Sequence, residues 1–565
     1  MKKTAILIIG LLFIFQGTSY PQTPPPSQSA GGVEQQEAQI KRQRALEKQI
    51  EKPKKKVEEE VEEKAAPVEE GAKVKVSDIE VKDATIVPAD VISKIVAPYK
   101  GKELTVGGMQ KICDLITDEY RKQGRVTSRA YLPPQKIKDG RLTIMVVEGK
   151  LGNVEVKGNR YFSSTLIKKK LRLKPGDYFD YQALQKALTS LNDTPDRFVK
   201  SVLEPGKEAG TTDVVLEVED RLPLHVGYEF DNFGSRYIDK DRHTVTVEHN
   251  NLLGLDDKLS FTFQKAQDSF YNYYNFRYLI PLLNNLDGGG YYLWNNTKLG
   301  KEFKAQNVTG RAQLAGLFFN YTIIDLATVT MRINGGFDYK SALNFISGRK
   351  AARDETRVLK FSTDLDMFDK WGRTVITLEE DTGLNIGNLH AKDPLGSRVG
   401  AGAEFFKLVG NLYRLQPMPF SSTILWKNSF QSSAYRLLAI EQFQLGGIAN
   451  VRGYAPGEFA GDAGLTSTVE WSFPPYGFPK DIKVPLSKST FYDAFRFVGF
   501  YDLGYVHIKS PGPTDKEDRT VQGYGCGMRF NLPEDFSARF EAGWRFNSKA
   551  SFGDANLYID VGKKF

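Results

Sequence analysis

The stretch Phe536-Ser-Ala-Arg-Phe-Glu-Ala-Gly-Trp-Arg-Phe-Asn547 alternates between two kinds of residue without a break. Its even positions hold phenylalanine, alanine and tryptophan, and its odd positions hold serine, glycine, asparagine and charged residues. Successive side chains of a β-strand point to opposite faces, so the stretch predicts a strand with one apolar and one polar face. The same period of two continues from Leu222 to Phe565, as in Gly523–Leu532 and Leu557–Phe565.

Charged residues recur on one face of these predicted strands, each of which is about ten residues long. This pattern fits a barrel with a polar interior and an exterior that faces lipid. The alternative interpretation is a large soluble β-protein. At roughly 21 residues for each strand and its loop, residues 222–565 have room for about sixteen strands. We therefore expect a transmembrane β-barrel of about 16 antiparallel strands over residues 222–565.

The first twenty residues have the composition of a secretory signal peptide. Lys2 and Lys3 precede an apolar run at residues 5–15, and small or polar residues follow at 17–19. A run of about a dozen residues is too short to span a bilayer as a helix. The alternative to a cleaved signal peptide is a membrane anchor that is retained. We expect residues 1–20 to be a signal peptide that directs the chain out of the cytoplasm.

Residues 33–52 favour helix throughout but contain few large apolar side chains, at Ile40, Leu46 and Ile50. A helix that is polar nearly all round cannot lie in a dry core, so we expect it to be solvated or to occupy a wet cavity. A proline ends this helix. Residues 53–73, which are rich in lysine and glutamate, then predict a charged, extended linker.

Residues 74–149 and 150–221 each predict a small α+β unit with the order strand, helix, helix, strand, strand. The order repeats after about 75 residues, which indicates an internal structural repeat. The predicted elements are, in the first unit, a strand at 74–81, helices at 89–99 and 106–123 and strands at 125–132 and 141–148, and, in the second unit, a strand at 154–156, helices at 165–173 and 181–192 and strands at 199–203 and 213–218. Cys113 lies on the longer predicted helix of the first unit and is interpreted as a core residue.

Composition and chemical motifs argue against an enzyme. The chain has 77 Lys and Arg against 69 Asp and Glu, two cysteines and five histidines, with no HExxH spacing. It has no GxSxG and no phosphate-binding loop, so we expect no catalytic residue, cofactor or metal. The acidic run Asp364-Leu-Asp366-Met-Phe-Asp369 suggests calcium at first sight, but on an alternating strand it is interpreted as lumenal or loop charge. The sequence shows no basic patch on a recognisable nucleic-acid-binding fold, so nucleic acid is not an expected partner.

A glycine-rich stretch at residues 446–464 lies between two predicted strands and contains a single cation, Arg452. The stretch is too long for a simple hairpin. It includes the tetrad Val451-Arg452-Gly453-Tyr454, which follows Leu445-Gly-Gly447. A single arginine in the middle of such a loop is a candidate functional residue.

A second motif, Phe500-Tyr-Asp-Leu-Gly504, lies in a predicted strand at residues 497–507. By phase, its first, third and fifth residues share one face, and aromatic residues and a leucine on the other face turn toward lipid. Asp502 is therefore expected to point into the lumen, where it can form a charge-assisted pair with Arg452 if the loop folds inward. Glu470 also faces the lumen by phase and is an alternative acceptor. Glycines on the neighbouring predicted strand, at 523, 525 and 527, would leave room for the loop.

The tetrad at 451–454, the Phe-x-Asp-x-Gly motif at 500–504, the terminal Phe565 and the paired α+β units resemble the outer-membrane assembly and secretion superfamily. This superfamily includes the outer-membrane β-barrel assembly factor, the chloroplast import channel and the two-partner secretion transporters. Two such units, called POTRA domains, behind a polar helix and a linker look most like two-partner secretion transporters of the haemolysin-activator and filamentous-haemagglutinin secretion type.

The resemblance implies a barrel in the bacterial outer membrane, with POTRA domains in the periplasm and the polar helix as a plug in the lumen. It implies that the tetrad loop tucks into the pore, that Arg452 pairs with Asp502, and that Gly453 and Tyr454 shape the tip of the loop. The implied function is export of a large unfolded exoprotein to the cell surface without ATP.

The expected partners are the unfolded exoprotein, outer-membrane lipid and lipopolysaccharide, and we expect the chain to be a monomer. POTRA units offer sheet edges to which an extended segment can add as a strand, and residues 125–132 and 199–203 are the expected edges. Two alternatives remain open at this point. One is a β-barrel insertase whose first and last strands part, for which more POTRA repeats would be expected. The other is a passive porin or adhesin-like barrel, against which the POTRA repeats argue.

Overall fold

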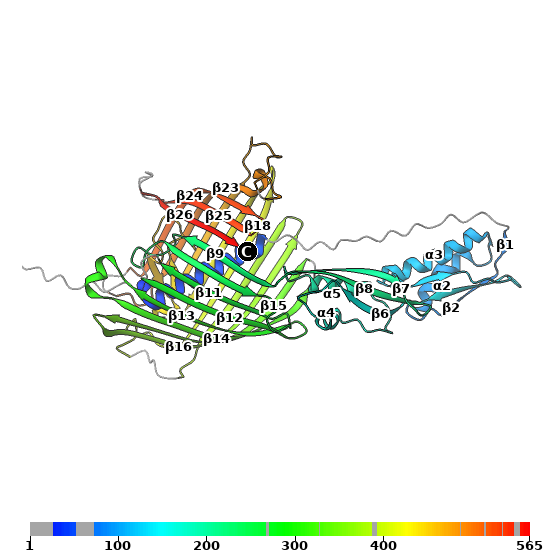
Figure 1. Cartoon of the computed structure of the whole chain (residues 1–565), viewed down its shortest axis with the longest axis horizontal. Helices are drawn as coiled ribbons and strands as arrows, with labels where there is room; N and C mark the ends of the chain where they lie inside the picture. The colour runs from blue at the N-terminus through cyan, green and yellow to red at the C-terminus, as the bar shows by residue number, and fades with distance from the viewer. Residues whose placement is uncertain are drawn as a thin grey trace, which may run out of the picture.

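The computed structural model describes residues 26–51, 73–266, 270–326, 328–386, 393–485, 487–512, 516–533, 535–546 and 554–565. The expected signal peptide at 1–20 and the expected linker, except for its last residue, lie outside these residues. Among the helices in the described ranges, none is long and apolar enough to cross a membrane. Figure 1 shows a large barrel of strands, with two smaller units extending in a row from one of its ends. We call that end of the barrel the near rim and the opposite end the far rim.

Sixteen antiparallel strands form one closed barrel, in which the last strand pairs with the first. The expectation of about 16 antiparallel strands is confirmed. The strands are β9 (Leu224–Asp231), β10 (Arg242–His249), β11 (Lys258–Ala266), β12 (Tyr271–Leu283), β13 (Leu286–Lys298), β14 (Thr309–Asp325), β15 (Val329–Ile346), β16 (Arg349–Asp369), β17 (Gly372–Gly383), β18 (Phe405–Met418), β19 (Ser422–Ser433), β22 (Ala463–Phe473), β23 (Phe495–His507), β24 (Asp518–Leu532), β25 (Phe536–Arg545) and β26 (Asn556–Lys564).

The alternation in the sequence sets which side chains face outward. On β23, Tyr501 is 41% exposed, whereas the neighbouring Asp502 is fully buried. On β25, Phe540 is 45% exposed and Glu541 is 3% exposed. Apolar side chains therefore cover the exterior and charged side chains line the interior, as a period of two requires of a barrel with a polar lumen.

The barrel wall is uneven around its circumference. β15 and β16 pair along nearly their whole length, from Val329 opposite Met367 to Ile346 opposite Arg349. The ladder at the closing seam between β26 and β9 pairs residues 560–564 with residues 227–231 and is the shortest of the barrel, although backbone hydrogen bonds of Val226 with Phe565 and of Asn232 with Ile559 extend the seam at its two ends. The long wall and the short seam are thus distinct parts of one sheet.

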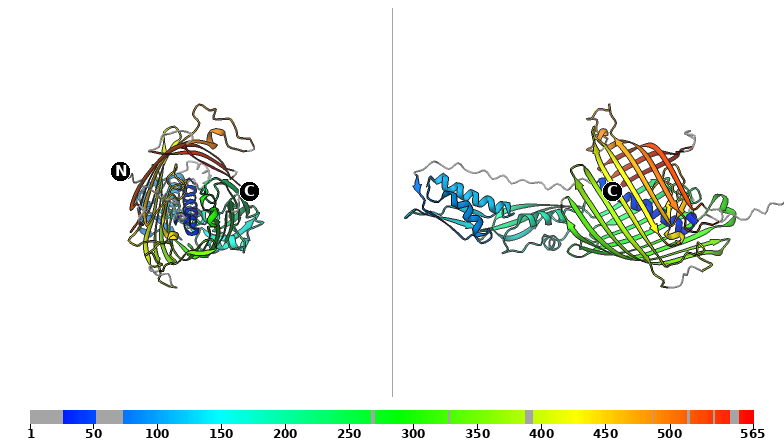
Figure 2. Two further views of the ribbon diagram at one scale, coloured as in Figure 1. Left: turned by 90° about the vertical axis from the view of Figure 1, so that its left-hand side faces the viewer. Right: turned by 180° about the vertical axis from the view of Figure 1, so that it is seen from behind.

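Helix α1 (Ala30–Glu51) runs through the barrel lumen, where Figure 2 shows it in dark blue. The helix begins a little before the predicted range and ends within it. Its polar residues pair with the wall, as when Arg42 binds Glu379 of β17 at 2.9 Å. Its apolar residues near the C-terminal end join a small cluster that consists of Leu46, Ile50, Val375, Tyr413 and Leu425. A polar helix can be buried here because the lumen supplies partners for its charges.

The first unit has a three-stranded sheet of order β2-β5-β4 and two α-helices. Its elements are β1 (Val74–Lys75), β2 (Asp78–Lys82), α2 (Ala89–Val96), η2 (Ala97–Tyr99), β3 (Glu103–Leu104), α3 (Val106–Lys122), β4 (Arg129–Tyr131) and β5 (Arg141–Val147). The predicted strand at 74–81 is wrong as one continuous element. The chain changes partner at Ser77, whose N–H donates to the carbonyl of Gly140 at 2.7 Å, so β1 pairs with β3 and β2 pairs with β5.

Helix α3 supplies much of the hydrophobic core of the first unit. Cys113, on this helix, is fully buried, and burial raises the pKa of its thiol to about 12. A thiol with so high a pKa is almost wholly protonated at neutral pH and is therefore a poor nucleophile. The predicted strand at 125–132 is shorter in the structure, because a turn closed by the N–H of Ser128 and the carbonyl of Arg125 precedes β4.

The second unit has a three-stranded sheet of order β6-β8-β7. Its elements are β6 (Lys150–Lys157), α4 (Ser164–Leu171), α5 (Tyr181–Leu191), β7 (Arg197–Pro205) and β8 (Thr211–Asp220). β4 of the first unit, which contains three of the eight residues of the expected edge at 125–132, and β7 of the second, which contains all of 199–203, each lie at an outer edge of their sheet. The two units therefore present free strands that run outside their cores.

Buried polar contacts join the second unit to the near rim. Arg197, at the start of β7, donates through Nη1 and Nη2 to the two carboxylate oxygens of Asp256 at 2.9 and 3.0 Å. The guanidinium also lies 4.6 Å from the ring centroid of Phe162. Burial raises the pKa of Asp256, but the contacts with Arg197 and Lys170 outweigh that effect and hold the pKa below its usual value. A charged pair of this geometry fixes the second unit against the barrel.

Candidate functional site

The connection between β19 and β22 folds into the barrel. We call residues 434–462 the inward loop. It contains η4 (Ala439–Glu441) and a small hairpin of β20 (Phe443–Leu445) and β21 (Phe459–Gly461). Its residues from 437 to 452 are buried except for one half-buried alanine. The hairpin carries the tetrad at its tip and brings it to the inner face of β22 to β25.

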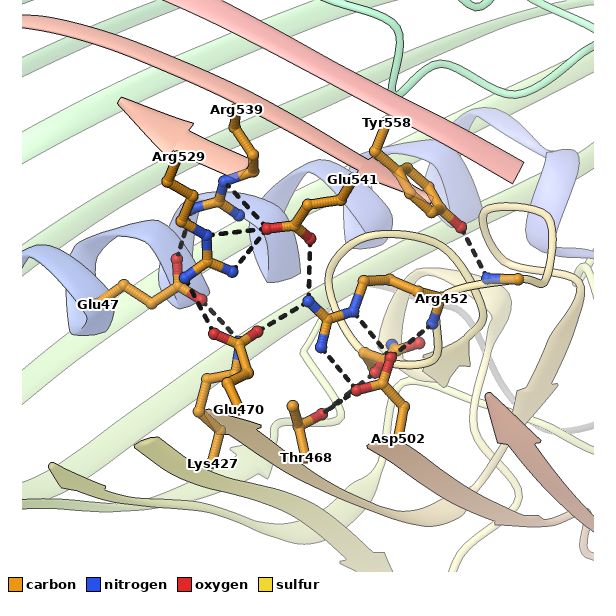
Figure 3. Close-up of polar contacts among 12 residues, drawn as sticks. Glu47, Lys427, Arg452, Thr468, Glu470, Asp502, Arg529, Arg539, Glu541 and Tyr558 are labelled. Atoms are coloured by element: carbon orange, nitrogen blue, oxygen red, sulfur yellow. Dashed lines mark hydrogen bonds and ion pairs between the residues drawn. The ribbon is translucent and has the colours of Figure 1, made fainter. Parts of the chain in front are cut away.

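Arg452, in the tetrad at the tip of the inward loop, is only 2% exposed. Its Nε and Nη2 donate to the two carboxylate oxygens of Asp502, both at 2.8 Å, and its backbone N–H donates to the same carboxylate at 3.0 Å (Figure 3). Its Nη1 donates to Glu470 at 2.8 Å and to Glu541 at 3.0 Å. The structure thus brings Arg452 against both acceptors that the sequence leaves open, and against Glu541, to which no motif points.

An aromatic ring and a hydroxyl complete the surroundings of this pair. The Cζ atom of Arg452 lies 3.3 Å from the ring centroid of Phe500, the first residue of the Phe-x-Asp-x-Gly motif. Thr468 donates its hydroxyl to Asp502 at 2.9 Å. A guanidinium can bind carboxylates in its plane while it stacks a ring on its face, which an ammonium group cannot do. The site is therefore built for arginine.

Close packing shapes the other residues of the tetrad. Gly453 has a φ of +95°, and a Cβ at this position would lie 2.6 Å from the backbone carbon of Trp544. Its N–H donates to the hydroxyl of Tyr558 at 3.0 Å. The ring of Tyr454 lies 4.5 Å from the guanidinium of Arg545. Glycine is thus required at 453 both by its backbone conformation and by the wall beside it.

Glycines of the wall, among them Gly504 on β23 and Gly523 on β24, make room for the loop. A Cβ at Gly504 would lie 2.7 Å from the side chain of Val451, which is fully buried. A Cβ at Gly523 would lie 2.1 Å from the carbonyl oxygen of Arg452. The sequence also singled out Gly525 and Gly527 on β24. Their nearest neighbours lie in β23 and β25, so these two glycines pack against the wall and not against the loop.

The charges around Arg452 are continuous with helix α1. Lys427 of β19 donates both to Glu470 and to Glu47 of the helix, each at 2.8 Å. Arginines on β24 and β25 contact the same acids (Figure 3). We call this set the Arg452 network, and its four basic and four acidic residues are Lys427, Arg452, Arg529, Arg539, Glu47, Glu470, Asp502 and Glu541. The inward loop and the helix therefore share one balanced charge network.

A second charged contact holds the opposite end of the inward loop. Glu441 of η4 is fully buried, and its carboxylate lies 3.0 Å from the ammonium of Lys340 on β15 and 2.7 Å from that of Lys407 on β18. It also accepts a hydrogen bond from Thr356 of β16 at 3.0 Å. We call this contact the Glu441 site. Sequence motifs miss it, because its partners lie on strands that are up to 101 residues away along the chain.

Further contacts tie the inward loop to the helix and to the far rim. Ile440 lies against Gly31 of α1, where an added Cβ would come within 3.0 Å of the Cβ of Ile440. Asp462, at the end of the loop, is fully buried and accepts the N–H groups of Leu437 and Lys509, both at 2.8 Å. The loop is thus held at both ends as well as at its tip.

Space remains beside α1 at the near rim. A cavity of about 1300 Å³ lies there between the C-terminal half of the helix, the second unit and the inner wall from β12 to β17. Charged residues of both signs line it, among them Arg42, Arg197 and Asp338. The lumen is therefore only partly filled, and its open part faces the second unit.

The described residues include no group of three or more His, Cys, Asp or Glu side chains that could hold a metal ion. In the acidic run, Asp366 binds Arg373 at 2.7 Å and Asp369 binds Arg414 at 2.6 Å. What the site offers is a set of buried ion pairs and hydrogen bonds that fix a loop and a helix inside a barrel.

Models of three protein families match both α+β units and most of the barrel. The model described as Haemolysin secretion/activation protein ShlB/FhaC/HecB matches residues 210–530. The model described as POTRA domain, ShlB-type, matches residues 74–149, and a POTRA model described as Surface antigen variable number repeat matches residues 150–221.

Characterised proteins and solved structures agree with these matches. The Outer membrane transporter CdiB of Escherichia coli is 23% identical over 471 residues, which cover 81% of this chain and 77% of CdiB. The Heme/hemopexin transporter protein HuxB of Haemophilus influenzae is 22% identical over 464 residues, which cover 79% of this chain and 78% of HuxB.

The fold is similar to that of solved barrels of this type. The structure of CdiB from Escherichia coli matches with a TM-score of 0.70 at 20% identity, over 94% of this chain and 99% of that chain. The structure of CdiB from Acinetobacter baumannii matches with a TM-score of 0.63 at 17% identity, over 96% and 100%. Because the ShlB/FhaC/HecB model covers more than half of its residues, the chain belongs to this family of two-partner secretion transporters of the outer membrane, and its two α+β units are periplasmic POTRA domains.

Proposed function

We propose that this protein captures an unfolded exoprotein with its POTRA domains and passes it through the barrel to the cell surface without ATP. The family supplies the class of function, which is outer-membrane protein secretion. An extended segment that adds to a sheet edge gains main-chain hydrogen bonds with little demand on its sequence. Folding of the exoprotein outside the cell would then draw the chain outward, so no step needs a catalytic residue.

The observation that carries the proposal is the free edge strand β7 beside the open part of the lumen. Within the described residues, β7 pairs with β8 on one side only. On its outward face, Phe198 and Val202 are 44% and 39% exposed. Apolar side chains beside a free edge are typical of a surface that binds another chain. Arg197, the first residue of β7, lines the lumen cavity, so a strand added along β7 would lie beside the entrance.

The first POTRA domain offers a shorter edge. Its outer strand β4 has only the residues 129–131, of which Tyr131 is 39% exposed. Because so short a strand provides few main-chain hydrogen bonds, we assign to β4 a supporting role in capture. The longer β7 is the main binding edge in this proposal.

Helix α1 and the inward loop take the roles of plug and lock in this proposal. The helix fills part of the lumen and pairs with the wall, which supports a role as a plug that limits passive flow. The pair of Arg452 and Asp502 is the lock that holds the inward loop in its working position. Glu470 acts as a further acceptor, since the geometry gives Arg452 contacts with both acids.

The test of capture adds charge to the β7 edge. The double variant Phe198→Asp with Val202→Asp should bind a labelled, unfolded fragment of the exoprotein about tenfold more weakly, a change of roughly 1.4 kcal/mol. The matched control, Thr165→Asp with Ala183→Asp, adds the same two charges in the first turns of α4 and α5, where acidic residues are tolerated. Fluorescence anisotropy with the purified proteins measures both affinities.

Secretion and energy source are tested with the same variants. Vesicles that hold the purified protein and contain no nucleotide should still translocate the fragment, and the edge variant should translocate less than the control. Equal binding by the edge variant and the wild type would place recognition away from β7. A requirement for added ATP would contradict the proposed energy source.

A further inference from the structure

The longest connection at the near rim joins β22 to β23 and consists of residues 474–494. We call it the long turn. The remaining strand pairs at this rim are joined by the much shorter segments 250–257, 284–285, 326–328, 370–371, 419–421 and 533–535. A hairpin of a barrel needs only a few residues to reverse direction, so the length of this segment calls for another explanation.

The described residues of the long turn, 474–485 and 487–494, form an ordered fold. The N–H of Val484 donates to the carbonyl of Ser489 at 2.9 Å, and the N–H of Phe491 donates to the carbonyl of Ile482 at 2.9 Å. The segment ends in the short helix α6 (Phe491–Ala494), capped by the hydroxyl of Thr490. These contacts give the segment a defined surface.

This segment extends away from the barrel axis. Both views in Figure 2 show the long turn, in orange, reaching outward beyond the wall of strands. The near rim is the periplasmic side of the barrel, because the POTRA domains are attached there. A segment that leaves this rim sideways runs along the surface of the periplasmic leaflet.

The base of the long turn continues the aromatic surface of the barrel exterior. The rings of Trp471 and Phe473 on β22 lie 5.0 Å apart, and Phe473 stacks on Tyr476 of the turn at 5.9 Å with an angle of 6°. At the other end, the ring of Phe491 lies 6.2 Å from that of Phe530 on β24. Aromatic girdles of this kind mark the level at which a barrel leaves the hydrocarbon core.

The outer part of the long turn combines exposed apolar residues with lysines. Phe478 is 55% exposed and Ile482 is 43% exposed. Lys480, Lys483 and Lys488 are exposed in the same segment, and they outnumber its two exposed acids, Asp481 and Asp493. Apolar side chains among lysines are typical of peptide segments that lie in the interface of an anionic membrane.

We propose that the long turn is a lipid-binding surface that docks on the periplasmic leaflet through anionic phospholipid headgroups. Phe478 and Ile482 enter the interface, and the three lysines contact the headgroup phosphates. The proposal rests on the outer-membrane location of the barrel and is independent of cargo capture by the POTRA domains. Continuity with the lipid-facing aromatic surface and the positive charge of the lysines favour lipid over a protein as the occupant.

The test uses the full-length protein in vesicles. A fluorophore is attached to Phe478→Cys in a chain that also carries Cys526→Ala, since Cys526 is exposed and Cys113 is buried. The label should be quenched by phospholipids with a nitroxide near the headgroup and protected from aqueous iodide. A label at Lys94→Cys, on the exposed face of α2, should show the opposite pattern.

The role of the lysines is tested by their replacement with glutamine at 480, 483 and 488. Addition of phosphatidylglycerol to phosphatidylcholine vesicles should increase the lipid quenching of the label in the wild-type turn, since each lysine near an anionic surface changes partitioning by about fivefold. The triple variant should lose this dependence. The matched control replaces Lys94, Lys168 and Lys169, which are exposed on the POTRA domains, and should keep it.

Each outcome is decisive. Heat-modifiable migration on gels first establishes that the variants hold a folded barrel. Quenching of the Phe478→Cys label by iodide to the same extent as the Lys94→Cys label would overturn the proposal and leave a protein partner as the occupant. Lipid quenching that does not change with phosphatidylglycerol would overturn the assignment of anionic headgroups.

Discussion

Two of the charged sites that hold the inward loop are of opposite design. At its tip, a cation of the loop, Arg452, meets three acids on β22, β23 and β25 and stacks on Phe500. At its other end, an anion of the loop, Glu441, meets two lysines on β15 and β18. The loop therefore crosses the lumen from one part of the wall to another, with one anchor on each.

The difference in chemistry indicates different tasks. A guanidinium that binds a carboxylate through two nitrogens and also stacks on a ring accepts only one orientation. A carboxylate between two ammonium groups accepts many orientations, because each ammonium group is a compact point charge on a flexible stem. We infer that the Arg452 network sets the position of the loop, whereas the Glu441 site holds the loop against the wall.

The largest effect is expected from Arg452→Ala. This change leaves three buried acids without their shared cation, and breaking a buried charge pair costs about 3–5 kcal/mol. Secretion should be abolished while the barrel still inserts, because strand pairing does not depend on the loop. Immunoblots of culture supernatants measure secretion, and heat-modifiable migration measures insertion.

The matched control is Arg436→Ala, which removes a half-exposed arginine from the same loop. Normal secretion by Arg452→Ala would mean that the loop is not the working part.

The next effect separates the acids around Arg452. Asp502 accepts three hydrogen bonds from Arg452, whereas Glu470 accepts one and also pairs with Lys427 and Arg529. Asp502→Ala should therefore reduce secretion nearly as strongly as Arg452→Ala, and Glu470→Ala should reduce it less. Quantitative secretion assays of the two variants at equal barrel levels decide the order. The reverse order would make Glu470 the principal acceptor.

The same comparison shows what the sequence can and cannot predict. Strand phase alone places Asp502 and Glu470 in the lumen, and the motifs single out Arg452 as their partner. Phase does not predict that Glu541, on another strand, lies at the same height, because strand register depends on pairing between segments that are distant in sequence. Arg529 escapes prediction for the same reason.

Other differences also arise from contacts between segments that are distant in sequence. Glu441 lies in a three-residue 3₁₀ segment, which has no periodic signature in the sequence, and its lysines come from distant strands. The barrel itself could be predicted, because a period of two over many strands requires only that one face meets lipid and the other water. The predicted strand at 74–81 divides in two because Ser77 takes a partner from a distant turn.

A smaller effect is expected at the Glu441 site. Glu441→Gln keeps the shape of the side chain but removes the charge between Lys340 and Lys407, and we expect a cost of about 1–3 kcal/mol for the polar groups left poorly paired. The inward loop should open more often on the far rim, and secretion should fall without being lost. Trypsin cleavage after Arg436 in intact cells, followed by mass spectrometry, measures the opening.

The control for this change is Glu404→Gln, which replaces an exposed acid just before β18. It should leave both trypsin cleavage and secretion unchanged. Loss of secretion in Glu441→Gln as complete as in Arg452→Ala would show that the two anchors have the same task, against the division inferred above.

The smallest effect is expected where the Arg452 network reaches the helix. Glu47→Gln weakens the contacts of α1 with Lys427 and Arg539 but leaves other ties, such as Arg42 with Glu379. A loss of about 1–2 kcal/mol would raise the open fraction of the channel by roughly 5- to 30-fold. Planar-bilayer recordings should show more frequent openings while secretion remains normal.

The matched control is Glu51→Gln, which changes an exposed acid one turn later on the same helix. Deletion of Ala30–Glu51 sets the upper limit of conductance, and if that deletion leaves the conductance unchanged, the helix does not act as a plug. If the deletion raises the conductance but Glu47→Gln opens no more often than the wild type, the Arg452 network ends at the wall, and the loop and the helix move independently.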